Sequence, residues 1–208
     1  MIGKKSSFVK VSLVYSIALV AVFATACSSS PEKKIVVMSS GKIKVDPNTK
    51  TVTLEPGTQH NEAEIVLSDK DKGVTVKSPA GEQTFEAPEN GLYLLNLKTD
   101  TLIGNIVNFG NGGMPASISN EQLEHMIDST RQLINGLNAS DANKTYFLQP
   151  QSIKRITANL NAQLINPYNG IPYQVQADQE GHMPEIYKFF TAKQKRESLE
   201  ELIQRIGH

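Results

Sequence analysis

Between Lys34 and Phe109 the apolar residues occur in short runs separated by turn residues such as Pro, Gly, Asp and Asn. The runs are KIVVM, KIKV, KTVTL, AEIVL, VTVK, QTFEA and GLYLLNL. They are rich in β-branched and aromatic residues, and the alternation in KIKV and TVTL is typical of a strand with one buried face. We therefore expect seven short strands forming an antiparallel β-sandwich or small barrel, with GLYLLNL at its centre.

After Phe109 the pattern changes to a helical period. Ser119 followed by Gln122 is a capping box, and it precedes an apolar stripe that runs to Leu137. Thr191 followed by Gln194 is a second capping box, which predicts a terminal helix from Ala192 to Ile206. Between the helices we expect strands at TYFL, AQLI, YQVQA and EIYKFF, and a short helix at PQSIKRITANL. The predicted fold class is α+β, with an all-β half followed by an α+β half.

The start of the chain reads as an export signal. Lys4, Lys5 and Lys10 precede or border the apolar run VSLVYSIALVAVFATA, and no acidic residue occurs before Glu32. The run is shorter than the ~20 residues that a transmembrane helix needs, and it ends in small residues that suit a signal peptidase.

The only cysteine, Cys27, follows this run directly. The sequence Ala24-Thr25-Ala26-Cys27 resembles the lipobox of bacterial lipoproteins, with Ala24 where that family most often has leucine. The resemblance implies cleavage between Ala26 and Cys27, diacylation of the Cys27 thiol and a membrane anchor. Because serine follows the cysteine, it also implies the outer membrane, facing the periplasm, in a Gram-negative host, or the outer side of a single membrane otherwise.

An ordinary secretory signal is the alternative, because A-T-A also fits the small-x-small rule of the general signal peptidase. A lone thiol without a disulfide partner in an oxidising compartment favours the lipobox. The expected organisation is a signal peptide (1–26), a lipid-anchored tether (27–33), an all-β domain (34–109), a Gly-rich linker (110–118) and an α+β domain (119–208).

Composition excludes several function classes. The chain has equal numbers of basic and acidic residues, so the part that remains after loss of the three signal lysines is slightly acidic. No dense basic run is available to follow a phosphate backbone, and we expect no nucleic-acid partner. Without further cysteines there are no disulfides or cysteinate metal sites. The absence of tryptophan disfavours a stacking platform for sugars.

The sharpest polar constellation is Glu121, His125 and Asp128, whose spacing places an imidazole between two carboxylates on one helix face. Such a face can hold a divalent cation or tune a base. It also lies opposite the apolar stripe, where any helix keeps its solvated charges, and we favour that interpretation. The remaining histidines, His60, His182 and His208, are expected to be exposed in loops or at the terminus.

Two further features of the sequence are candidate sites. FGNGGMPAS has the context of a phosphate-binding loop but matches no phosphate-binding motif, so a linker is the preferred interpretation. Aromatic residues of the second half either line a groove for a peptide or glycan or, as we prefer, pack in the core. These residues are Tyr168, Tyr173, Tyr187, Phe189 and Phe190.

These patterns favour a membrane-anchored envelope lipoprotein that acts as a non-catalytic interaction or structural module. Its expected partners are the membrane, through the lipid on Cys27, and an envelope protein or polymer; no catalytic residue, metal or cofactor is assigned. The alternatives are an envelope hydrolase acting on cell-wall or glycan material, and a small-ligand carrier. The hydrolase requires a titratable cleft between the halves, whereas the carrier requires an enclosed apolar pocket of roughly 300 Å³ or more.

Overall fold

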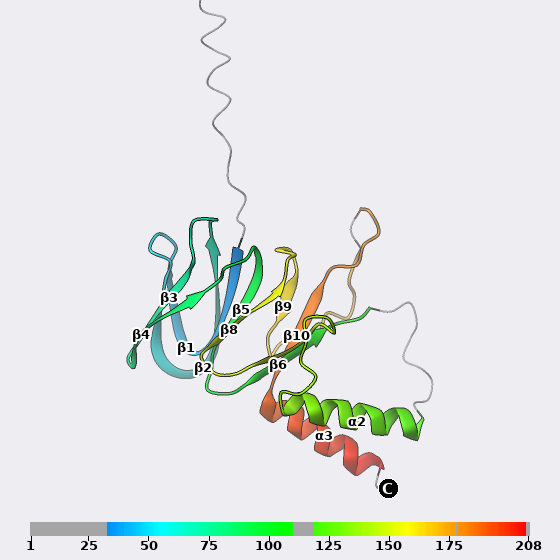
Figure 1. The fold of residues 1–208 in the computed structure, drawn as a ribbon. Coiled ribbons are helices and arrows are strands. Elements are labelled where there is room, and N and C mark those ends of the chain that lie inside the picture. The colour runs from blue at the N-terminus through cyan, green and yellow to red at the C-terminus, as the bar shows by residue number, and fades with distance from the viewer. Residues whose placement is uncertain (1–32, 110–118, 178, 207–208) are drawn as a thin grey trace, which may run out of the picture. The chain divides into compact units, whose positions relative to one another are not determined.

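The computed structural model describes residues 33–109, 119–177 and 179–206, which belong to a compact unit, Pro31–His208. The described residues form ten strands and two helices, in agreement with the predicted α+β class (Figure 1). The strands are β1 (Lys33–Asp46), β2 (Thr51–Leu67), β3 (Gly73–Ser78), β4 (Gly81–Glu86), β5 (Gly91–Leu97), β6 (Leu102–Ile106), β7 (Thr145–Leu148), β8 (Ser152–Thr157), β9 (Gln163–Ile165) and β10 (Ile186–Thr191). The helices are α2 (Asn120–Ile134) and α3 (Ala192–Ile206).

A long bent hairpin organises the first sheet, whose strand order is β4-β3-β2-β1-β5-β8. Strands β1 and β2 pair along almost their whole length, with a register shift between Ser40 and Lys42. At this bend Gly41 has a φ of +105°, and a Cβ on Gly57 would lie 2.8 Å from the Cα of Gly41, so both positions favour glycine. The sheet curves at the bend into a nearly closed barrel, with β4 and β8 at its open seam.

This bend explains why the strands differ in length and pairing from the expected ones. KIVVM and KIKV form one strand, β1, and KTVTL and AEIVL form one strand, β2, because glycine bulges replace the expected turns. The β1–β5 and β2–β3 pairs are parallel, so the sheet is mixed and not purely antiparallel.

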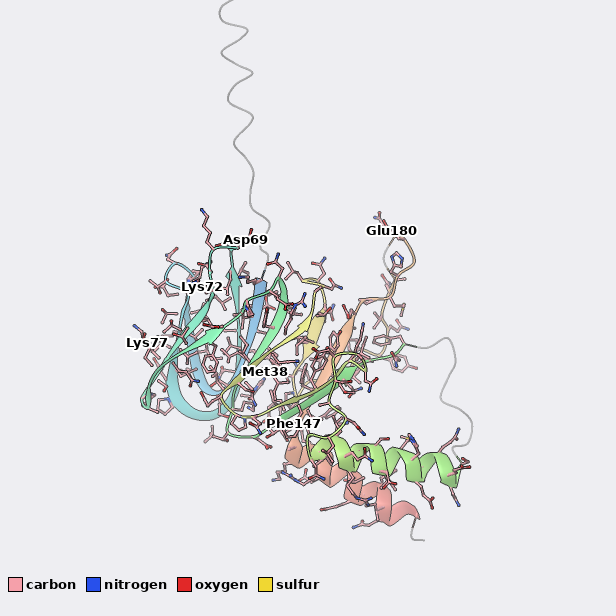
Figure 2. All side chains as sticks on the ribbon, in the orientation of Figure 1. Met38, Asp69, Lys72, Lys77, Phe147 and Glu180 are labelled. Atoms are coloured by element: carbon pink, nitrogen blue, oxygen red, sulfur yellow. The ribbon has the colours of Figure 1, made fainter. Side chains whose placement is uncertain are left out.

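The second sheet, in the order β7-β6-β10-β9, covers the outer face of β1 and β5. One core fills the barrel, with Ile35, Val37 and Leu95 among its buried members. The other lies between the sheets, where Met38 (Figure 2) and Leu94 meet residues such as Phe189. The alternation along β1 thus supplies both cores, one from each face.

The halves expected from the sequence share both sheets. Strand β8, from the second half, pairs with β5, and β6, from the first half, lies between β7 and β10. The segment 152–157 was predicted as part of a short helix and is a strand, because its pairing with β5 outweighs the local helical pattern. The expected strand at YQVQA is absent from the described structure of this segment.

Both predicted helices and their capping boxes are confirmed. Ser119 and Gln122 exchange hydrogen bonds at the start of α2, and Thr191 and Gln194 do so at the start of α3. The two helices lie side by side beyond the end of β10 (Figure 1). On α2 only Ile127 is buried among the described side chains. Neither described helix combines the length and the apolar composition required to cross a membrane.

Candidate functional site

Several of the predicted site residues lie outside the described residues. These are Ala26 and Cys27, the linker 110–118 and His208. The lipobox therefore remains a prediction from the sequence.

Glu121, His125 and Asp128 lie on the exposed face of α2. Asp128 pairs with Nη1 of Arg131 at 2.7 Å, and Nδ1 of His125 is 3.5 Å from the hydroxyl of Ser129. Within residues 33–109, 119–177 and 179–206, no three His, Cys, Asp or Glu side chains are arranged to hold a metal ion. The solvated-face interpretation fits the positions of these three side chains.

The aromatic residues of the second half do not form one groove. Tyr187 and Phe189 are fully buried between the sheets, whereas Tyr173 is 98% exposed and Tyr168 is 59% exposed. The core interpretation is therefore correct for Tyr187 and Phe189. It is wrong for the two tyrosines in the loop that follows β9. Phe190, the third aromatic residue of β10, is only partly buried, and Nζ of Lys188 and Nζ of Lys195 lie 4.9 and 4.3 Å from its ring centre.

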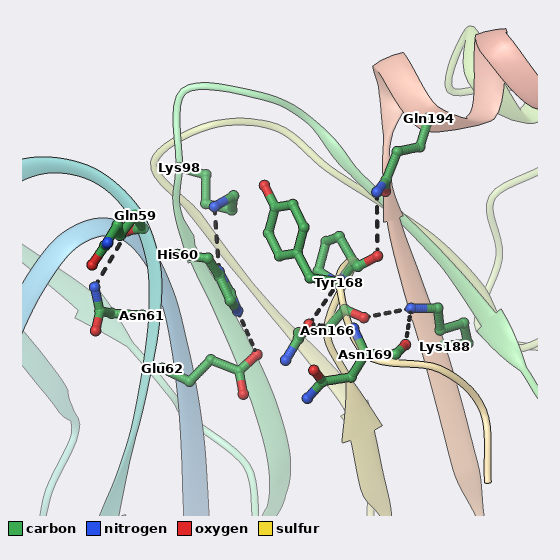
Figure 3. A network of polar contacts seen from close by, with 11 residues as sticks. Gln59, His60, Asn61, Glu62, Lys98, Asn166, Tyr168, Asn169, Lys188 and Gln194 are labelled. Atoms are coloured by element: carbon green, nitrogen blue, oxygen red, sulfur yellow. Dashed lines mark hydrogen bonds and ion pairs between the residues drawn. The ribbon is translucent and has the colours of Figure 1, made fainter.

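A polar cluster lies where β2, the end of β5 and the loop after β9 meet (Figure 3). Nε2 of His60 is 3.0 Å from Oε1 of Glu62, and Nδ1 of His60 is 3.3 Å from Nζ of Lys98. The ring of Tyr168 is centred 4.9 Å from the imidazole and 5.3 Å from Nζ of Lys98. We call these four residues the His60 cluster.

The contacts of His60 define which ring nitrogen carries the hydrogen. A protonated lysine offers only hydrogens, so Nδ1 accepts from Lys98 and the ring hydrogen lies on Nε2, facing Glu62. The His60 side chain is only 15% exposed, so the prediction of an exposed loop histidine was wrong. His182, by contrast, has a 72% exposed side chain, as predicted.

Two buried lysines support the cluster. Lys98 and Lys188 are 4% and 5% exposed. Burial lowers the pKa of each amine, and the negative charge of Glu62 acts in the opposite direction on both. Both ammonium groups are therefore stabilised mainly by contacts with protein groups and little by hydration.

Lys188 fixes the start of the loop between β9 and β10. Its Nζ donates to the carbonyl oxygens of Asn166 at 2.5 Å and Asn169 at 2.6 Å. The side-chain oxygen of Asn166 accepts from the backbone N–H groups of Tyr168 and Asn169, which closes a tight turn. The turn holds Tyr168 against His60, so the cluster positions the base of a long loop.

A second polar centre surrounds Glu185, at the start of β10. Its carboxylate accepts from Nζ of Lys144 at 2.8 Å, from the hydroxyl of Tyr187 at 2.5 Å and from Thr157 at 3.0 Å. Burial acts to raise the pKa of Glu185, but these hydrogen bonds together outweigh it and lower the pKa below 4.5. Burial and the bond to Glu185 raise the pKa of Tyr187, which keeps this phenol a donor.

Glu185→Gln is expected to destabilise the protein by about 2 kcal/mol at pH 7, because a charge-assisted acceptor is lost. A lowered folded-state pKa contributes stability above the ordinary value of 4.5, and this contribution is lost as the pH falls through the folded pKa. The difference between wild type and Glu185→Gln should therefore shrink in acid. Urea unfolding from pH 7 to pH 3 measures it, with the exposed Glu124→Gln as control. If the difference in unfolding free energy between wild type and Glu185→Gln did not change with pH, the lowered pKa of Glu185 would be contradicted.

The described residues line several open clefts. One has a volume of about 1040 Å³, and three others have volumes of about 650, 430 and 360 Å³. All four are open to solvent and include charged or polar side chains, unlike the enclosed apolar pocket expected of a small-ligand carrier.

No family model, curated protein or solved structure matches this chain. Its functional site is therefore defined by its own residues alone.

One signal in the sequence marks the region of the site: Ile156–Ala177 contains no Asp, Glu, Lys or Arg, although 20% of the chain is charged. This uncharged segment includes the loop base at Tyr168 and part of the wall of the largest of the four clefts.

Proposed function

We propose that this chain is a lipid-anchored protein of the bacterial cell envelope whose compact unit is a non-catalytic binding module. The observation that carries the proposal is the position of Cys27, directly after A-T-A at the end of an apolar run. Acyl chains contribute ~0.8 kcal/mol per buried methylene, and two or more chains anchor a protein stably. The mature chain would then remain in the membrane.

The length of the tether supports a function close to the bilayer. Strand β1 begins at Lys33, six residues after Cys27. Even a fully extended chain spans at most about 3.5 Å per residue, so this tether reaches about 20 Å. A module held at that distance suits a ligand or partner that is itself part of the envelope.

The loop between β9 and β10 supports the binding role. It lacks regular structure in its described residues, and connections of this length are commonly functional. Its exposed large apolar side chains include Tyr168, Ile171, Tyr173 and Met183, with exposed fractions from 46% to 98%. Exposed apolar groups gathered on one segment mark interaction surfaces, and Lys188 anchors this loop at its base.

The anchor is tested by the intact mass of the protein purified from membranes of its own host. We expect a mass equal to residues 27–208 plus acyl chains, and membrane association that Cys27→Ser abolishes. Ser29→Ala is the matched control and should leave both unchanged. An unacylated soluble chain that starts at Cys27 or later would overturn the anchor and leave an ordinary secretory signal as the explanation.

A further inference from the structure

The cleft of about 1040 Å³ lies where the chain leaves β6, against the uncharged segment and the residues that lead into β10. Apolar contacts come from Ile106, Phe109 and Met183. We call it the β6 cleft. Its volume is at the upper end of the range of sites that hold small ligands.

The charges that line the β6 cleft are compensated. Nζ of Lys144 pairs with Glu185 at 2.8 Å, and the same carboxylate also accepts from Tyr187 and Thr157. His182 lies 3.6 Å from the carboxylate of Glu180. A charged ligand would lose hydration here without gaining an unpaired opposite charge, so the cleft suits an uncharged ligand.

Four carboxamides line the same cleft: Asn108, Asn159, Asn161 and Gln176. Each offers two N–H donors and an acceptor oxygen. The oxygen of Asn159 accepts from the backbone N–H of Asn161, whereas the side chains of Asn108 and Gln176 are exposed to solvent. Groups that both donate and accept are complementary to hydroxyl and acetamido groups.

The sheet disfavours a peptide as the occupant. An extended peptide gains most of its affinity by adding a strand to a free sheet edge. Strand β6 lies between β7 and β10, and beyond it the N–H of Val107 still donates to Ile186 at 2.7 Å. Recognition in the β6 cleft therefore relies on side chains, which suits a ligand whose own polar groups point outward from rings.

We propose that the β6 cleft binds an uncharged saccharide chain, with hydroxyl or acetamido groups on the carboxamides and sugar C–H faces on the apolar side chains. This rests on the proposed function, because a short envelope anchor holds the cleft among envelope polysaccharides. Tryptophan is absent, so the carboxamides carry more of the recognition than stacking does.

The test is a titration of the full chain, purified in detergent, with the N-acetylglucosamine pentamer, followed by calorimetry and by NMR of the sugar. We expect a Kd of about 1 mM or tighter, weakened about tenfold or more in the double variant Asn108→Leu/Gln176→Leu. Both side chains are exposed, so the variant should fold. Gln83→Leu/Asn143→Leu, which changes two exposed carboxamides elsewhere, is the matched control and should bind like wild type.

The other outcomes of the titration distinguish saccharide binding from other ligands and from catalysis. Absence of pentamer binding, or equal binding by the Asn108→Leu/Gln176→Leu variant, would overturn the proposal. So would a preference for an oligogalacturonate or for an uncharged hexapeptide over the pentamer. New reducing ends in the sugar spectrum would leave saccharide binding intact but refute the non-catalytic role. Loss of the anchor is visible separately in the intact mass.

Discussion

Replacing Asn96 by aspartate is expected to destabilise the protein by about 3–5 kcal/mol, because one oxygen of the buried carboxylate would face only carbonyl oxygens. Asn96 is completely buried on β5. Its Nδ2 lies 3.0–3.1 Å from the carbonyl oxygens of Asp100, Leu148 and Gln149, and its Oδ1 accepts from the backbone N–H of Lys98. Aspartate has the same shape, but its carboxylate would face three carbonyl oxygens.

Urea unfolding of Asn96→Asp at pH 7 measures this loss, and exposed Asn143→Asp is the matched control. The introduced carboxyl should have a raised folded-state pKa, because only its neutral form can donate to a carbonyl. A raised folded pKa favours folding at low pH, so part of the lost stability should return as the pH is lowered towards 4. A change smaller than about 0.5 kcal/mol at pH 7, the range typical of surface substitutions, would contradict the role of Asn96.

Gly104→Ala is expected to cost about 1–3 kcal/mol or more, because the buried ring of Phe189, its partner on the neighbouring strand β10, lies directly over Gly104. A Cβ on Gly104 would lie 2.3 Å from Cε1 and 2.4 Å from Cδ1 of Phe189. Phe189 is completely buried between the two sheets, so its ring has no free space to move into.

Chemical unfolding again gives the measurement. Gly170→Ala is the matched control, since no atom lies within 4 Å of the added Cβ, and it should change stability by less than about 0.5 kcal/mol. Phe189→Leu should cost less in the Gly104→Ala background than in wild type, because the two changes share one contact. Strict additivity of the two substitutions would show that the ring is not the obstacle.

Local signals predicted much of the fold. Both capping boxes lie within four residues of chain, and they correctly located the starts of α2 and α3. Alternation and turn residues correctly located most strands. The prediction of a helix at 152–157 was wrong because its partner strand β5 lies some 60 residues earlier, and no local pattern contains information on that pairing. The β1–β2 hairpin was divided too finely because Gly41 and Gly57 form a bend within paired strands and do not end them.

The polar cluster was harder to predict than the fold. Lysines are usually exposed, so nothing local to Lys98 or Lys188 announces that both are buried. His60 was placed in a loop because EPGTQHNE resembles a turn, whereas it continues β2 beyond the bend. The signal in the sequence that indicated this region was the lack of charged residues from Ile156 to Ala177, because an exposed loop usually carries charged side chains.

The sharing of both sheets by distant segments has a consequence for how the chain folds as it emerges, amino end first. Strand β1 appears early and meets β2 at once, but its other neighbour, β5, gains its outer partner only when β8 arrives. The outer face of β1, with Val36 and Met38, then waits for Tyr187 and Phe189. This apolar face therefore stays exposed until nearly the whole chain has emerged. Because exposed apolar surface promotes aggregation, β1 is the strand that we expect a chaperone to bind first.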